Sequence, residues 1–390
     1  MNNTKDIIEK KYIGTEIEEK FVDIIANRKF SAVSPILIKG VREKSKKMTP
    51  IELMNNYKNK SQFFRPSELD LGEILEYNLV FFKILPHNYK KIQLSPINPL
   101  GTNSVITKVS QDVTLATTRN SEVNGDPTTA LTLESAYLRK EMAKSRETMF
   151  NTVSLATVHR VLRLQNFDKD KGYMQHFNLF GIVSSGREKQ KDTFIYETIK
   201  EHIEIWIKFI REITKKGYTF NKICVNISNI NFIEHLINEG YLKRIDVNLN
   251  SLNDEYDLFK QNNIKLPNQI QSLNELEENL IKSYNLEKLI PLYKQIEEKI
   301  IKDLKNRYKG IEFCIDFNRK AGLGYYEGLC YHIFAQNATG NNIQLADGGV
   351  VNWNQQLLSD KKELSVTSGF GAELIQKLFK REGNSKNEIL

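Results

Sequence analysis

The spacing of apolar residues along the chain predicts an alternation of helices and strands. Apolar positions that recur every three or four residues are typical of amphipathic helices. We expect such helices at 4–29, 71–85, 135–149, 187–217, 273–308 and 372–380. Short runs of β-branched and aromatic residues bounded by Gly, Pro or Asn are typical of strands. We expect strands at 92–97, 105–118, within 153–166, and at 177–184, 220–227, 311–317, 329–335, 343–346 and 364–368.

The order of these elements indicates an α+β fold, an antiparallel sheet flanked by helices. Residues 1–66 are less regular after their first helix and end at Pro66, so we expect an N-terminal extension followed by a core at 67–390. The core carries a helical insertion at about 187–310. Within it, the Asn- and charge-rich stretch 230–273 is expected to be a partly mobile excursion, and the polar ending after 380 is expected to fray.

Composition narrows the function classes. Hydrophobic residues make up 40% of the 390 positions, which suffices for a core, yet no apolar run is long enough to cross a bilayer. The first residues, MNNTKDIIEKK, lack the apolar region of a secretion signal. Cys224, Cys314 and Cys330 lie in apolar contexts without C-x-x-C spacing, which is typical of reduced thiols. We therefore expect a cytoplasmic protein with no structural zinc and no membrane segment.

The charge balance is basic. The 56 Lys and Arg residues against 48 Asp and Glu give a formal net charge of +8, which is compatible with a phosphate-rich partner. The lysines are nevertheless spread along the helices, and the densest run is KGVREKSKK at 39–47. This distribution favours a solvated surface over a groove for nucleic acid.

The run AGLGYYEG at 321–328, followed by Asp347 and two glycines, is the most informative motif. Tyr325 and Tyr326 stand where a strand begins, so one would face a pocket and the other the core. Glycines let the backbone approach a ligand closely. On this segment alone, a hairpin with two core tyrosines explains the pattern equally well.

The run resembles the substrate-binding loop of histidyl-tRNA synthetases, R-G-L-D-Y-Y-T-G followed by G-G-R-Y-D. Three further segments extend the resemblance to class II aminoacyl-tRNA synthetases over about 67–380. The helix at 71–85 with the strand closing at Pro96 is similar to their first motif, which implies a homodimer through 71–97. The run LTLESA at 131–136 is similar to L-R-P-E-x-T, whose glutamate begins a helix and pairs with the substrate's ammonium group.

Two more segments resemble the motifs that hold ATP. The run VLRLQ at 161–165, a charged loop at 168–172 and the pair His176–Phe177 are similar to the second motif. The run TSGFGAEL at 367–374 is similar to the third motif. Because a guanidinium fork suits phosphate oxygens, the resemblance implies that Arg163, or Arg160 in an alternative alignment, holds the α-phosphate during attack by a carboxylate.

The resemblance thus implies two sets of site residues and no metal ligands, with ATP and Mg²⁺ as cofactors if the protein is an enzyme. The implied ATP-binding residues are Arg163, Gln165, Phe177, Gly369, Gly371 and Glu373. The implied substrate-binding residues are Glu134, Tyr325, Tyr326, Glu327 and Asp347.

Several positions depart from the family pattern. Leu374 stands where the third motif has the arginine for the γ-phosphate, and Val350 stands where G-G-R-Y-D has its arginine. Leu179 and Gly181 replace the polar residues that hold the amino group. Ala321 replaces the arginine before the tyrosine loop, and Lys320 or Arg319 could reach that space only if the loop bulges.

The sequence ends after the third motif without an anticodon-binding domain, so specific charging of tRNA is not expected. Two functions outside translation remain open. One is a ligase that activates a carboxylic or amino acid as an acyl-adenylate, which the retained Arg163 and the convergent acids and tyrosines favour. The other is a non-catalytic regulatory subunit of ATP phosphoribosyltransferase in histidine biosynthesis, paired with a catalytic subunit. Leu374 and Val350 favour this second function.

Overall fold

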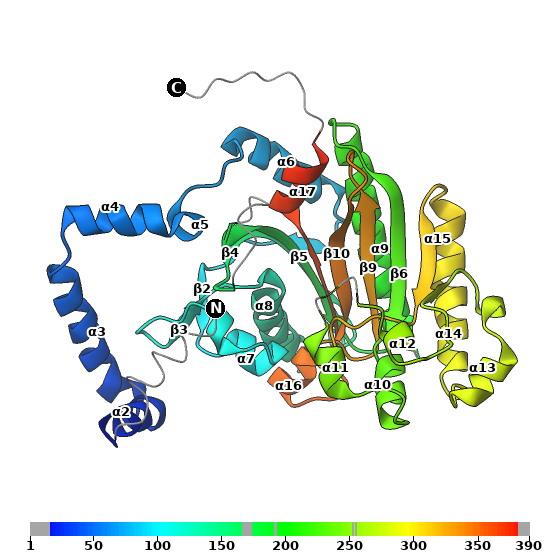
Figure 1. Cartoon of the computed structure of the whole chain (residues 1–390), viewed down its shortest axis with the longest axis horizontal. Helices are drawn as coiled ribbons and strands as arrows, with labels where there is room; N and C mark the ends of the chain where they lie inside the picture. The colour runs from blue at the N-terminus through cyan, green and yellow to red at the C-terminus, as the bar shows by residue number, and fades with distance from the viewer. Residues whose placement is uncertain (1–15, 166–173, 191–192, 252, 254–255, 381–390) are drawn as a thin grey trace.

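A nine-stranded sheet forms the centre of the computed structural model, which describes residues 16–165, 174–190, 193–251, 253 and 256–380 (Figure 1). The strands lie in the order β1-β4-β5-β11-β10-β9-β6-β8-β7. Their bounds in that order are Tyr89–Lys91, Val153–Leu162, His176–Gly186, Leu364–Phe370, Asn342–Val351, Leu329–Gln336, Asn221–Asn229, Glu312–Asp316 and Gln269–Ile270. The central pairings from β4 to β6 are antiparallel, whereas β1–β4 and β6–β8 are parallel. The predicted α+β fold is confirmed.

Helices cover both faces of the sheet, and the alternation of side chains along β5 shows why. Phe180 stacks on Phe81 of α6 (Leu71–Ile84), with ring centroids 4.3 Å apart, on the face that α9 (Thr193–Thr214) also covers. The next residue, Gly181, faces α8 (Pro127–Met142). A Cβ at this glycine would lie 3.2 Å from Pro127, so the absence of a side chain lets the helix approach the strand.

The helical insertion packs against the sheet. Its elements are α10 (Asn231–Asn238), α11 (Arg244–Leu249), α12 (Leu258–Gln261), α13 (Glu278–Ser283), α14 (Ile290–Ile296), a π-helical turn (Glu297–Ile301) and α15 (Lys302–Arg307). Phe232, Val247 and Leu258 are buried in the main core. The described part of 230–273 is therefore not an excursion, and that prediction is wrong because its apolar residues belong to the core.

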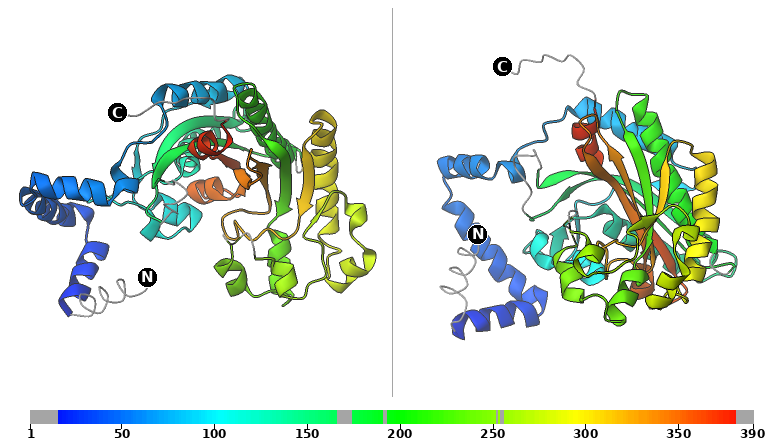
Figure 2. Two further views of the ribbon diagram at one scale, coloured as in Figure 1. Left: turned by 45° about the horizontal axis from the view of Figure 1, so that its top comes forward. Right: turned by 45° about the vertical axis from the view of Figure 1, so that its right-hand side comes forward.

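The N-terminal extension is a helical arm that projects from the body (Figure 2). It comprises α2 (Glu16–Asn27), α3 (Phe30–Lys46), α4 (Pro50–Asn59) and α5 (Ser61–Phe64). The prediction that 30–66 is less regular is wrong for most of this segment. Thr49 and Glu52 cap each other's backbone N–H groups at the start of α4, which stabilises a helix across the polar run that follows.

The chain between 92 and 149 differs most from the predictions. Residues 92–96 lie between β1 and the short strand β2 (Ile97–Pro99), and 105–118 contains no long strand. Instead the chain forms α7 (Thr102–Thr107), a 3₁₀ turn (Gln111–Val113) and β3 (Ser121–Val123). The buried carboxylate of Glu122 accepts hydrogen bonds from the N–H groups of Gly101 and Asn103, both at 2.8 Å, and so caps α7 from a distant position.

The helix predicted from Ser135 begins eight residues earlier, at Pro127. The other core elements lie close to their predicted positions, with α16 (Trp353–Leu358) added and α17 (Ala372–Phe379) at the end of the described chain. The predicted frayed ending, 381–390, lies outside the described residues. Within the described chain, no helix is both long and apolar enough to span a bilayer.

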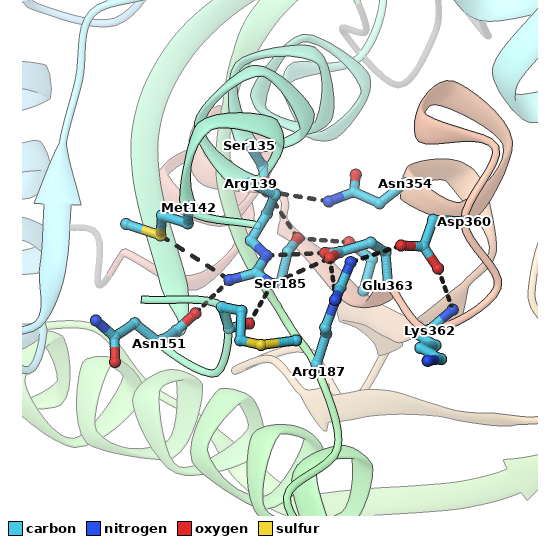
Figure 3. Close-up of polar contacts among 12 residues, drawn as sticks. Ser135, Arg139, Met142, Asn151, Ser185, Arg187, Asn354, Asp360, Lys362 and Glu363 are labelled. Carbon is cyan, nitrogen blue, oxygen red and sulfur yellow. Dashed lines mark hydrogen bonds and ion pairs between the residues drawn. The ribbon is translucent and has the colours of Figure 1, made fainter. Parts of the chain in front are cut away.

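A buried ion network fixes α8 against the sheet (Figure 3). Arg139 of α8 donates to both carboxylate oxygens of Glu363, at 2.8 and 3.0 Å, and to the carbonyl oxygen of Met149 at 2.8 Å. Arg187 donates to the same carboxylate at 2.6 Å. Because Arg139 and Glu363 are both inaccessible to water, their pairing is needed to keep either charge in the core. The network holds the helix whose opposite end forms the site described next.

Candidate functional site

A cavity of about 520 Å³ opens between the N-terminal end of α8 and strands β10 and β11. Segments far apart in the sequence line it. Of the residues implied by the sequence, seven lie in its wall: Arg163, Gln165, Tyr325, Tyr326, Asp347, Gly369 and Gly371. Arg163, which follows β4, and the tyrosine loop thus lie at one cavity.

Asp126 is the acidic residue at the start of α8 and lies in the cavity wall. Its Oδ1 accepts hydrogen bonds from the backbone N–H and the hydroxyl of Thr128, both at 2.8 Å. Its Oδ2 accepts a bond from the Tyr325 hydroxyl at 3.4 Å and lies 3.9 Å from Nη2 of Arg163. Asp126 thus joins three parts of the cavity wall.

The spacing of Asp126 and Thr128 is that of the acid and threonine in E-x-T. The resemblance of LTLESA to this motif implies Glu134 as its acid, with a helix that starts at Ser135. In the structure Glu134 lies two turns into the helix and is not among the residues of the cavity wall. The signal that identifies Asp126 is local, because an acidic N-cap followed directly by proline is typical of a helix start.

Arg163 follows β4 and is held by its neighbours. Its Nε donates to the carbonyl oxygen of Gly125 at 2.8 Å, and its guanidinium lies 5.5 Å from the centre of the Phe177 ring. Phe177 therefore supports the arginine from β5, although it is not itself in the cavity wall. The charged loop predicted at 168–172 lies outside the described residues.

The two tyrosines form a buried aromatic wall. Their rings meet edge to face, with centroids 4.8 Å apart, and Tyr325 also contacts Trp353 at 5.0 Å. Burial raises the pKa of both phenols well above the usual value; the carboxylate of Asp347 raises the pKa of both further, and that of Asp126 raises the pKa of Tyr325. Both hydroxyls therefore stay protonated and can act as hydrogen-bond donors.

The turn before the tyrosines places Arg319 behind the cavity wall. Gly322 has φ +94°, and a Cβ there would lie 2.6 Å from the Tyr326 ring, so only glycine fits. Arg319 Nη2 donates to Asp347 Oδ1 at 2.8 Å, and its guanidinium lies 5.1 Å from the centre of the Tyr326 ring. This turn thus lets Arg319 approach the site despite Ala321, whereas Lys320 donates to the carbonyl oxygens of residues 253 and 256.

Asp347 is a carboxylate over the physiological pH range. Burial alone would raise its pKa, but Arg319 and His332 outweigh burial and hold the pKa of Asp347 well below its usual value. His332 Nε2 lies 3.5 Å from Oδ1. Asp347 therefore contributes negative charge to the cavity wall, with a buried guanidinium behind it.

Besides Glu134 and Phe177, two more of the implied residues lie outside the cavity wall. Glu373 is buried on α17, where its carboxylate accepts bonds from the Ser67 hydroxyl, from Arg160 at 3.1 Å and from the Asn178 N–H at 3.1 Å. It joins the start of the core to the sheet and is not in the cavity wall. Glu327 accepts a bond from Asn352 and is likewise outside the wall.

The cavity has more acid than base. Among the described residues of its wall, Arg163 is the single cation, against the two carboxylates of Asp126 and Asp347. Leu374, at the position where the family pattern has the γ-phosphate arginine, also lies in the wall, as does Leu179. Other apolar wall residues are Val109, Val113, Leu345 and Phe370. In the described part of the chain, no group of acids, histidines and cysteines is arranged to hold a metal ion.

The comparisons with known proteins agree with this fold. The chain is similar to an ATP phosphoribosyltransferase regulatory subunit/histidyl-tRNA synthetase from Bacillus halodurans, with a TM-score of 0.55 and 14% identity over 81% of this chain and 82% of that chain. It is also similar to histidyl-tRNA synthetase from Nostoc, with a TM-score of 0.55 and 16% identity over 81% and 74%. A histidine–tRNA ligase subunit from Alicyclobacillus acidocaldarius gives a TM-score of 0.56 and 13% identity over 80% and 94%.

No family model and no curated protein matches the sequence. At these identities the likeness shows the fold alone, which is class II synthetase-like.

Proposed function

We propose that the chain is a ligand-binding regulatory protein built on the histidyl-tRNA synthetase fold. Its cavity would hold an amino-acid-like ligand by the protonated amine, without forming an adenylate. The observation that carries this proposal is the charge of the cavity wall: Asp126 and Asp347 lie in it with Arg163, while Arg319, the guanidinium that pairs with Asp347, lies behind it.

The amine would lie at Asp126. The Oδ1 of this carboxylate is already engaged by Thr128, whereas its Oδ2 accepts a single bond, of 3.4 Å, from Tyr325. An ammonium group next to Oδ2 would gain a charge-assisted hydrogen bond, which contributes about 1.5–3 kcal/mol. The ligand's carboxylate would lie toward Arg163, the single cation in the described wall. This polarity suits a zwitterion.

ATP fits the described residues poorly at its triphosphate end. Gly369 and Gly371 leave room for a flat base against the backbone of β11 and the start of α17. The phosphates, however, would meet Leu374 and the carboxylate of Asp347. Leu374 offers the phosphates no charge, and Arg319, which pairs with Asp347, lies behind the wall, so a multiply charged anion gains little at this end of the cavity. ATP is therefore not the ligand that we propose for this cavity.

The proposal is tested by a thermal-shift screen of the full chain against each of the twenty protein amino acids, combined with an ATP–pyrophosphate exchange assay on the same panel. We expect at least one amino acid to raise the melting temperature and none to support exchange. Exchange above background with any member of the panel would overturn the regulatory proposal.

A second candidate is the acyl-adenylate ligase, which one observation favours. Arg163 shares the cavity wall with Gly369 and Gly371 and stacks on Phe177, and all four residues belong to the set implied for ATP binding. If exchange is observed, Arg163→Ala should abolish it.

The likeness to a protein named as a regulatory subunit of ATP phosphoribosyltransferase supports a catalytic partner subunit. We propose that this chain pairs with a phosphoribosyltransferase subunit and that the pair acts in the cytoplasm. We also propose a homodimer through 71–97. Leu71, Leu75 and Leu79 form an exposed stripe along α6, at the spacing of one helix face. Light scattering that shows only a monomer would contradict the dimer.

A further inference from the structure

Two leucines in the cavity wall do not belong to the hydrophobic core. Leu179 of β5 and Leu374 of α17 are both partly buried, and both lie in the wall. Neither belongs to any of the three hydrophobic clusters that the described residues form. Apolar surface that lines a cavity is removed from water when an apolar group of a ligand fills the space beside it. The two leucines are therefore candidates for contact with a ligand.

A backbone contact brings both leucines to the same end of β5. The backbone N–H of Asn178, the residue before Leu179, donates to the Glu373 carboxylate at 3.1 Å. Glu373 in turn precedes Leu374 at the start of α17. The two leucines therefore flank one contact between strand and helix, although 195 residues separate them in the sequence.

Two glycines leave the space beside the leucines open. The nearest described atom to a Cβ placed on Gly369 would be the carbonyl oxygen of Phe180, at 3.8 Å. A Cβ placed on Gly371 would lie 3.9 Å from its nearest described neighbours, one of which is the Cβ of Leu374. These distances are ordinary van der Waals contacts, so neither position is blocked. We call this space the apolar slot; it is bounded by Leu179, Gly369, Gly371 and Leu374.

We propose that the apolar slot holds the side chain of the ligand, and that the ligand is an α-amino acid with a large apolar side chain, such as leucine, methionine or phenylalanine. This inference rests on the proposed amine site at Asp126 and adds the class of side chain that the cavity accepts.

The slot lies within reach of a ligand whose amine is bound at Asp126. The next residue, Pro127, packs against Gly181, where a Cβ would lie 3.2 Å from the proline. Gly181 is paired with Gly369 on the neighbouring strand, about 4.8 Å away. The side chains of leucine, methionine and phenylalanine can cover one strand spacing from the ligand's Cα atom, whereas the methyl group of alanine cannot.

A basic side chain is the main alternative, because Asp347 borders the slot. Asp347 is paired with Gly369 in the ladder between β10 and β11. Its Oδ1 accepts a hydrogen bond from the buried Arg319 at 2.8 Å, so this carboxylate already has a cationic partner. An ammonium or guanidinium group would lose water beside the two leucines, whereas an apolar side chain gains from the same surfaces. The surroundings therefore favour an apolar group.

The inference is tested by isothermal titration calorimetry of the full chain with alanine, leucine, methionine, phenylalanine, lysine, arginine, glutamine and histidine. We expect the best large apolar amino acid to bind about ten- to a hundredfold more tightly than alanine, the gain from burying such a side chain. Leu179→Gln makes the slot polar, and Gly369→Val fills it with a side chain that suits a strand. Each should lower the ratio of large apolar to alanine affinity at least tenfold. Leu249→Gln, at an exposed leucine of α11, is the control and should leave the ratio unchanged.

The outcomes separate the side-chain class from the amine site. If a polar or charged amino acid binds most tightly and Asp126→Asn weakens that binding, the amine site stands and the apolar slot is wrong. If a large apolar amino acid binds most tightly but Leu179→Gln and Gly369→Val weaken alanine binding equally, its side chain lies elsewhere and the inference also fails. If no amino acid binds, or if Asp126→Asn leaves binding unchanged, the proposed function fails and the inference fails with it.

Discussion

Replacing Asp126 by Asn tests the assignment of the amine-binding group. The substitution keeps the shape of the side chain and leaves an acceptor for the Thr128 N–H, and Asn is as good an N-cap as Asp. We therefore expect the free energy of unfolding to change by less than about 0.5 kcal/mol. The negative charge opposite the ligand's ammonium is lost, which should cost about 1.5–3 kcal/mol of binding, or about ten- to a hundredfold in Kd.

The assay is isothermal titration calorimetry with the amino acid that gives the largest thermal shift. Glu134→Gln is the matched control, because it removes a carboxylate from the same helix at the position that the sequence alone suggested. We expect Asp126→Asn to weaken binding and Glu134→Gln to leave it within a factor of two. The reverse result would refute the placement of the site at the start of α8.

Three further predictions concern the core and the ATP end of the cavity. Arg139→Leu should lower the free energy of unfolding by about 3–5 kcal/mol in urea titrations, because Glu363 loses a buried partner, whereas Lys140→Leu on the exposed side of α8 should have little effect. Burial lowers the pKa of His202 to about 3, so protonation of this side chain favours the unfolded chain. Its contribution to the free energy of unfolding is complete above pH 6.5 and should fall by up to about 1.4 kcal/mol per pH unit below pH 6.5. His202→Gln should flatten this slope between pH 7 and 5, and an unchanged slope would contradict the assignment. Leu374→Arg should tighten ATP binding about ten- to a hundredfold in calorimetry, because it adds a guanidinium to the cavity wall; unchanged affinity would show that the phosphates do not lie there.

The sheet was predictable because its strands carry their own signals. The antiparallel pair β4–β5 and the strands from β9 to β11 appear as apolar runs bounded by glycine or polar residues, and they fix the positions of Arg163 and of Tyr325. Strand order and register then follow from pairing between segments that no local pattern specifies. Six of the seven implied residues in the cavity wall lie at or just beyond the ends of these strands, and Asp347 lies within β10.

The errors have identifiable physical causes. Glu122 caps α7 from about twenty residues away, so the local sequence of 105–118 gives no hint of a helix. Asp126–Pro127 is a local signal for the start of α8, whereas the resemblance of LTLESA to a family motif favours a start near Ser135. Arg319 reaches the site through a turn with φ +94° at Gly322. A glycine in the sequence shows that such a turn is possible but does not predict the position of the side chain before it.

The N-terminal arm shows a different limit. Its helices were obscured by a polar composition that resembles a loop, although the Thr49–Glu52 capping box marks the start of α4.

The most direct test of the account is a crystal structure of the full chain with the amino acid selected by the thermal-shift screen. We predict that the ligand's amine lies within hydrogen-bonding distance of the Asp126 carboxylate, with the Tyr325 hydroxyl beside it and the ligand's carboxylate toward Arg163. A ligand bound outside this cavity, or an amine held at Glu134 with Asp126 uninvolved, would contradict the claim that these distant segments form one binding site.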